Sequence, residues 1–461
     1  MLFILSQASI FGQDSARTIN AEQVIALIHQ FHPIAKQAGL GVQIAQAELS
    51  IARAGFEPLF YGEIANKNFD QKEYYNSAQY EVKIPAWFGI EIVNGMQDLS
   101  GQNLDPSQTK GLTNYTGIEI PLLKNLILDK RRAYLKQAKL YKTMALAEQQ
   151  SMLNNLMMNA MESYWTWVKN YQIYLVLNQN VQINQKRFEW VRKSFILGER
   201  AAIDTIEALA QLQQFELLKN NAWLGFQNAG LELSQYLWTK EEKPYVLPEE
   251  VIPENGWENE LKIYQFNVDL NQLLTLANKY HPDLQYYSNK VEVYAVEKRL
   301  KFQELLPKVS FKYHILGSGT NILQSINSSE LFVNNYQFGL KAELPLLMLN
   351  GRGQFAKSSF KLKEVSYELM NKQFAIELKI KSYYNNFQNY KTQIALQSQN
   401  YQNNLTLTKG EIEKLENGES SLFLVNTRES KSLDAFEKLI DLKTKYFKTL
   451  YSMQWSAGLL R

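Results

Sequence analysis

The chain of 461 residues contains no cysteine. That absence excludes disulfide bonds, thiolate metal sites and a cysteine nucleophile. An excess of charge of one sign is also lacking, because 49 basic side chains nearly balance 46 acidic ones and the net charge is +3. Proteins that bind nucleic acid, or that attach to membranes through a polybasic segment, carry a clear positive excess. The composition therefore predicts no nucleic-acid partner.

Long hydrophobic runs are missing as well. No stretch of about 18 apolar residues occurs, so no transmembrane helix is predicted. Membrane β-strands alternate in polarity and leave only a weak hydropathy signal, so this absence does not exclude them. The first residues, "MLFILSQASIFGQDS", form a short apolar run followed by small residues. We interpret residues 1–18 as a signal-peptide remnant, which predicts export.

Proline is confined to a few zones, and none of the 11 prolines lies between Leu122 and Lys243 or beyond Pro345. Because proline costs about 3 kcal/mol inside a helix, these gaps predict two long helical regions. Apolar residues within them recur in alternating steps of four and three, which predicts coiled-coil core packing and not a cofactor site. The two series are Met157, Met161, Tyr164, Val168, Tyr171 and Leu175, and Ile376, Ile380, Tyr383, Phe387, Tyr390 and Ile394.

The same markers occur twice along the chain. The His-Pro pairs that begin at His32 and His281 lie 249 positions apart, and the Gly-Glu pairs that begin at Gly198 and Gly418 lie 220 apart. Markers in one order with slowly shrinking offsets indicate a tandem duplication. The offset shrinks because the first copy is predicted to contain a longer loop around residues 84–111.

The duplication predicts the organisation of the chain. We assign residues 19–238 to a first repeat, 239–266 to an inter-repeat linker and 267–461 to a second repeat. Each copy is predicted to contain a short helix up to the His-Pro pair, a second helix, two strands, a very long helix, a Gly-Glu break and a final helix.

Two segments of the second copy alternate in polarity. In "KVSFKYHI", Phe311 and Tyr313 share one face, and Lys312 and His314 share the other. The segment "YQFGLKAEL", which begins at Tyr336, alternates in the same way. Such strands suit lipid on one side and water on the other, although a half-buried sheet of a soluble protein has the same period. The very long helices beside four such strands favour the membrane interpretation.

At this point the sequence resembles the TolC-like outer membrane efflux proteins. The resemblance rests on the two His-Pro turns, on "EIPLLKN" and "ELPLLMLNGRG" before the long helices, and on the two Gly-Glu hairpins. It implies a mostly α-helical chain with a membrane β-barrel part, in which three copies each give four strands to one 12-stranded barrel. It further implies a periplasmic helical tunnel, no cofactor, and partners comprising outer membrane lipid, a periplasmic adaptor and an inner-membrane pump of RND or ABC type.

The resemblance also assigns functional residues, because the helical hairpins form the periplasmic tip of the tunnel in this family. It places the adaptor-docking tips at Gly198, Glu199, Gly418 and Glu419, the candidates for the aperture at Asp204, Glu207, Leu424 and Thr427, and a strand-to-helix turn at Asn350, Gly351 and Arg352. Leu424 and Thr427 replace acidic residues of the best-known members, which argues against a carboxylate ring at that level. For Glu199 and Glu419, stabilisation of a helix N-terminus is an equally good interpretation.

Enzymatic alternatives find little support. "GRGQFA", which begins at Gly351, matches a dinucleotide-binding pattern, but a very long helix follows it in place of the required βαβ unit. The four histidines show no metal-ligand spacing. We predict no catalysis and an outer-membrane channel for efflux or secretion. The alternative is a soluble periplasmic coiled-coil adaptor or scaffold, which would have no need for lipid-facing aromatic residues.

Overall fold

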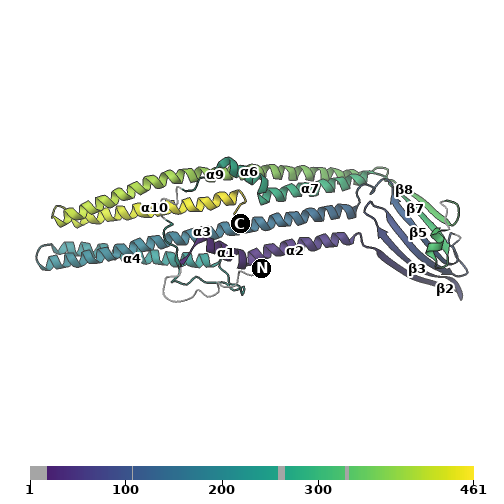
Figure 1. Cartoon of the computed structure of the whole chain (residues 1–461), viewed down its shortest axis with the longest axis horizontal. Helices are drawn as coiled ribbons and strands as arrows, with labels where there is room; N and C mark the ends of the chain where they lie inside the picture. Colours follow the sequence, from purple (N-terminus) through teal and green to yellow (C-terminus); the bar gives the residue numbers. More distant parts are fainter. Residues whose placement is uncertain (1–17, 106, 258–264, 328–331, 461) are drawn as a thin grey trace. The chain divides into compact units, whose positions relative to one another are not determined.

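The computed structural model describes residues 18–460 except 106, 258–264 and 328–331 (Figure 1). The expected signal-peptide remnant, residues 1–18, lies outside the described residues apart from Thr18. The chain divides into two compact units. The helical unit comprises Met1–Gly39, Glu148–Asp283 and Gln373–Arg461, and the sheet unit comprises Leu40–Ala147 and Leu284–Lys372. Each unit therefore draws on both of the expected repeats, whose bounds stay a prediction.

The sheet unit contains one antiparallel sheet with edges at β2 and β8 (Figure 1). Its hydrogen-bonded order is β2 (Leu59–Phe69), β3 (Lys72–Pro85), β4 (Glu91–Ser100), β5 (Gly111–Pro121), β7 (Lys308–Ser318) and β8 (Tyr336–Glu343). Helix α2 (Pro33–Ala54) precedes β2, and helix α7 (Pro282–Phe302) with the 3-10 turn η1 (Gln303–Leu305) precedes β7. The short helix α8 (Ile322–Asn327) lies between β7 and β8.

The expected four strands per chain are not what the structure shows, because the sheet formed by the described residues has six. Residues 84–111, expected as a longer loop, contain the end of β3 and the whole of β4. On β4 the apolar Ile92 and Met96 share a face with the polar Asn94 and Asp98. The contrast between faces that identifies a half-buried strand is therefore absent from this part of the sequence.

The helical unit is built around two helical hairpins. Its elements are α1 (Ala21–Phe31), α3 (Lys130–Ile196), α4 (Ala202–Ser234), α6 (Leu270–Tyr280), α9 (Leu349–Glu416) and α10 (Leu422–Ser456). The two long helices, α3 and α9, contain 67 and 68 residues and continue into the sheet unit. The expected helices and their order are confirmed. Among the described helices, none combines the length and hydropathy needed to cross a membrane.

The His-Pro pairs turn the chain in the same way in both copies. His32 ends α1 and its Nδ1 accepts a hydrogen bond from Ile34 N at 3.1 Å. His281 ends α6 and its Nδ1 accepts from Asp283 N, also at 3.1 Å. Both imidazoles are buried, and burial lowers the pKa of His32. The side chain thus supplies an acceptor to a backbone amide in the first turn of the next helix, where the amides have no partner within the helix.

The predicted heptad series form the core of the helical unit. All their members are buried except Leu175, Tyr383 and Tyr390, which are half-buried. Aromatic rings extend this core, because Trp165 stacks on Phe447 with ring centroids 4.5 Å apart and meets Trp257 edge-on at 5.4 Å. The expected linker contributes Trp257 and the strand β6 (Ile252–Pro253), which pairs with β1 (Thr18–Ile19) in parallel.

Candidate functional site

Both hairpins of the helical unit turn through a glycine in the left-handed conformation. Gly198 has φ +78° and Gly418 has φ +79°. Each glycine amide, and the glutamate amide that follows it, donates to a carbonyl of the last helical turn, as in a Schellman motif. Glu199 N meets Ser194 O at 2.9 Å, and Glu419 N meets Lys414 O at 2.8 Å. The predicted break is therefore a closed turn between two helices in each copy.

The first turn of each return helix differs between the two hairpins. Ser421 precedes α10, and its side chain accepts a hydrogen bond from Leu424 N at 3.4 Å. Ala201 precedes α4 and offers no side-chain cap. Glu199 and Glu419 are exposed and lie three residues before these helices begin, where an acidic group still favours the helix dipole.

Apolar side chains surround both turns. Ile196 and Leu197 before the first turn are 70% and 73% exposed, and Phe423 after the second is 66% exposed. The other exposed members of this hairpin-end surface are Phe195, Ile203, Ile206 and Leu424. A turn that only needed to be soluble would carry polar residues here, so this surface has the composition of a contact region.

The aperture candidates occupy different surroundings. Asp204 pairs with Arg200 across 3.7 Å within the first hairpin, and the Arg200 guanidinium lies over the Trp190 ring at 4.6 Å. Glu207 faces the second hairpin, since its Oε1 accepts from Asn426 Nδ2 at 3.4 Å. The structure thus places Glu207 at the seam between α4 and α10, whereas Asp204 stays beside the turn of its own hairpin.

The second hairpin supplies no carboxylate at the corresponding positions. Leu424 is exposed, and the Thr427 hydroxyl donates to its own helix at Phe423 O, 2.8 Å away. Glu411 of α9 is held beside this turn, because it accepts a hydrogen bond from the Ser420 hydroxyl at 2.6 Å. This hydrogen bond and the nearby Lys414 and Arg428 lower the pKa of Glu411.

The ends of the two hairpins share one hydrophobic core. It joins α3, α4, α9 and α10 through Val191, Ala208, Leu415, Leu422 and Val425. Further from the turns, Arg187 of α3 and Glu429 of α10 form a bidentate ion pair with N–O distances of 2.7 and 2.5 Å. Their side chains are only 10% and 7% exposed. The two hairpins are therefore connected by both apolar contact and a buried charge pair.

The predicted strand-to-helix turn lies slightly earlier than expected. Asn350, Gly351 and Arg352 belong to the first turn of α9, which begins at Leu349, and the change of direction occurs at residues 344–348. Gly351 is nevertheless constrained, because a Cβ there would lie 2.5 Å from the backbone oxygen of Glu304. Its role is close approach of α9 to η1.

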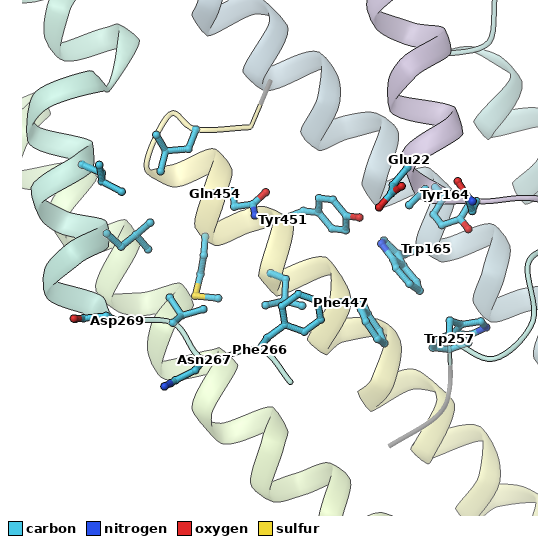
Figure 2. Close-up of a pocket in the computed structure, with 18 of the residues that line it drawn as sticks. Glu22, Tyr164, Trp165, Trp257, Phe266, Asn267, Asp269, Phe447, Tyr451 and Gln454 are labelled. Atoms are coloured by element: carbon cyan, nitrogen blue, oxygen red, sulfur yellow. The ribbon is translucent and has the colours of Figure 1, made fainter. Parts of the chain in front are cut away.

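A cavity of about 740 Å³ opens in the helical unit beside the aromatic core (Figure 2). Trp165, Trp257 and Phe447 line it, and the Tyr451 hydroxyl points towards the Glu22 carboxylate. Asp269, also in the lining, caps α6 by accepting from Asn271 N at 2.8 Å. No group of three or more His, Cys, Asp or Glu residues that could hold a metal occurs in the described part of the chain.

Comparisons with known proteins agree with this geometry at the level of the fold. No protein-family model and no curated protein matches the sequence. Among solved structures, the Campylobacter jejuni CmeC outer membrane channel is 14% identical, with 95% of this chain and 86% of that chain covered and a TM-score of 0.66. The Vibrio cholerae outer membrane protein VceC is 13% identical, with 95% and 96% covered and a TM-score of 0.66.

A third similar structure is the open state of the Neisseria gonorrhoeae MtrE outer membrane channel. It is 11% identical, with 96% of this chain and 89% of that chain covered and a TM-score of 0.66. Likeness over nearly the whole length confirms the expected TolC-like fold.

Proposed function

We propose that the chain is an outer-membrane exit duct for efflux or secretion that works as a homotrimer. The observation that carries this proposal is the shared fold, since CmeC and MtrE are described as outer membrane channels and each likeness covers at least 95% of the chain. Strands β7 and β8, each with one apolar and one polar face, support placement in the outer membrane. The long helices would extend into the periplasm, and transport through the duct would be passive.

We further propose that the hairpin-end surface binds a periplasmic adaptor, which connects the duct to an inner-membrane pump of RND or ABC type. The surface combines two hydrogen-bonded turns with exposed Ile196, Leu197 and Phe423. Large apolar side chains around a fixed turn are suited to contact with the hairpin of another coiled-coil protein. Glu207, at the seam of the two hairpins, is the acidic residue best placed to affect the aperture.

Membrane fractionation tests the channel itself. The chain is expected to sediment with outer membranes, to require detergent for extraction and to have the mass of a trimer. Phe338→Lys, on the apolar face of β8, should lower membrane recovery because it places a charge against lipid. Gln337→Lys, the next residue on the charged face, is the matched control and should not lower it. Recovery of the unsubstituted chain in the soluble fraction would contradict the channel and favour the adaptor or scaffold.

Substitution of the hairpin glycines tests the docking surface. Gly198→Val places a β-branched residue at φ +78°, which costs about 1–3 kcal/mol and reshapes the turn. A photo-crosslinker at Leu197 is expected to capture a periplasmic adaptor in cells, and Gly198→Val should abolish this product while trimers still form. Gly198→Asn, which tolerates this conformation, is the control. An unchanged crosslink in the valine variant would exclude docking at this turn.

A further inference from the structure

The hairpin of β3 and β4 is the part of the sheet that exceeds four strands, and it is paired on both sides. β3 pairs with β2 from Lys83 to Lys72, and β4 pairs with β5 from Glu91 to Leu99. Removing the hairpin from the sheet would break both ladders and leave backbone N–H and C=O groups without partners. It is therefore an integral part of the sheet.

One apolar row of the sheet continues across this hairpin. One row of directly paired residues runs through Ile84, Ile92, Ile118, Tyr313 and Phe338, which belong to β3, β4, β5, β7 and β8. All except Tyr313 are at least 37% exposed. In this row the hairpin presents the same kind of surface as the other strands, as lipid-facing strands require, while the same face of β4 also carries the polar Asn94 and Asp98.

The charged face also ties the hairpin to the rest of the sheet. Tyr115 of β5 crosses over Gly95 of β4, and its hydroxyl donates to Glu81 of β3 at 2.7 Å. A Cβ at Gly95 would lie 2.3 Å from the Tyr115 ring, so glycine is needed for this crossing. Gln79 Nε2 donates to the same hydroxyl at 3.0 Å. The contact spans three neighbouring strands and requires β4 between β3 and β5.

On the basis of the proposed trimer, we infer that each copy contributes six strands to the closed sheet of the assembled channel. Three copies would then form a closed sheet of eighteen strands, whereas four strands per copy would give twelve. Within the described residues β2 pairs only with β3 and β8 only with β7, so β8 of one copy is free to pair with β2 of the next. Six alternating strands leave these edges antiparallel, and each edge carries one acidic and one basic side chain on the charged face, Glu63 and Lys67 on β2 and Glu343 and Lys341 on β8.

The inference predicts a wider opening. The diameter of a closed sheet grows roughly linearly with strand number, so eighteen strands give about 1.5 times the width of twelve.

Disulfide trapping tests strand order in trimers within the membrane, and the chain has no native cysteine to interfere. Two pairs of cysteine substitutions should each form a disulfide, because the residues are direct cross-strand partners. They are Phe60→Cys with Val82→Cys, and Ile92→Cys with Ile118→Cys. Ile84→Cys with Ile118→Cys is the matched control. These residues lie in the same row but two strand spacings apart, about 10 Å, which is too far for a disulfide.

A cysteine at Ile64 of β2, combined in turn with one at Phe338, Leu340 or Ala342 of β8, tests closure between copies. At least one combination should give covalent trimers. Membrane trimers without the Ile92–Ile118 crosslink, or without any β2–β8 crosslink, would overturn six strands per copy and leave the channel proposal standing. Soluble monomers would overturn both. A density map of the unsubstituted trimer decides the same point, because eighteen strands support the inference and twelve refute it.

Discussion

Replacing Glu429 by leucine is expected to destabilise the paired hairpins by about 3–5 kcal/mol. The substitution leaves the Arg187 guanidinium, only 10% exposed, without its counter-charge. Asn184 cannot compensate, because its Oδ1 offers a single neutral acceptor to Arg187 Nη1 at 3.2 Å. Hydrogen exchange of the α3 and α10 amides near the pair measures the change as a lower free energy of local opening.

Two variants separate the cost of an unpaired charge from the loss of an attraction. Arg187→Met combined with Glu429→Leu removes both charges and should recover most of the lost stability. Glu377→Gln breaks the exposed Lys381–Glu377 pair, whose side chains are 46% and 45% exposed, and should cost at most about 0.5 kcal/mol. If the double variant is as unstable as Glu429→Leu, the stability depends on the ion pair itself and not on avoiding an isolated buried charge.

Two glycines near the start of α9 are expected to respond in opposite directions to the same substitution. Gly351→Ala should destabilise the sheet unit by about 1–3 kcal/mol, because its Cβ would lie 2.5 Å from Glu304 O. Glu304 cannot easily retreat, since its carboxylate pairs with Lys124 at 2.6 Å. Gly353→Ala has no atom within 4 Å of its Cβ and should stabilise the helix by about 0.5–1 kcal/mol.

Thermal unfolding of the detergent-solubilised chain measures both effects. The midpoint should fall for Gly351→Ala and rise for Gly353→Ala. A rise in both would show that η1 yields to the added methyl group and that Gly351 is not required for close approach.

Local features of the sequence predicted the helical part of the fold well. Proline gaps and heptad spacing identify the long helices, and Gly198 and Gly418 identify their ends because a left-handed turn needs little beyond the residue itself. The start of α3 was less visible. The chain between Leu122 and Asp129 contains no proline, yet Asn125 adopts a positive φ of 71°, and the helix begins only at Lys130.

The sheet and the candidate site depend more on contacts between distant residues. The end of β3 alternates in polarity from Ala78 to Ile84, whereas the sequence of β4 does not alternate. β4 is held by its neighbouring strands and by the Tyr115–Glu81 hydrogen bond that crosses it. Likewise, Arg187 and Glu429 are 242 positions apart, so their pairing follows only once α3 and α10 are packed together. The hairpin-end surface could have been predicted from the sequence, because several large apolar residues lie next to Gly198, where a solvent-exposed turn would normally be polar.

The position of the extra hairpin shows how a sheet of this kind can change size in evolution. The chain enters this hairpin after Phe69 of β2 and leaves it before Gly111 of β5, and both points lie at the same end of the sheet. One insertion in a single loop is therefore sufficient, and the flanking strands keep their directions and their helices. A single added strand would instead reverse every strand after it and send the next helix to the wrong side. When a sheet grows by whole hairpins, its number of strands can change while the arrangement of the helices stays the same. The sheet and the helices can therefore evolve independently.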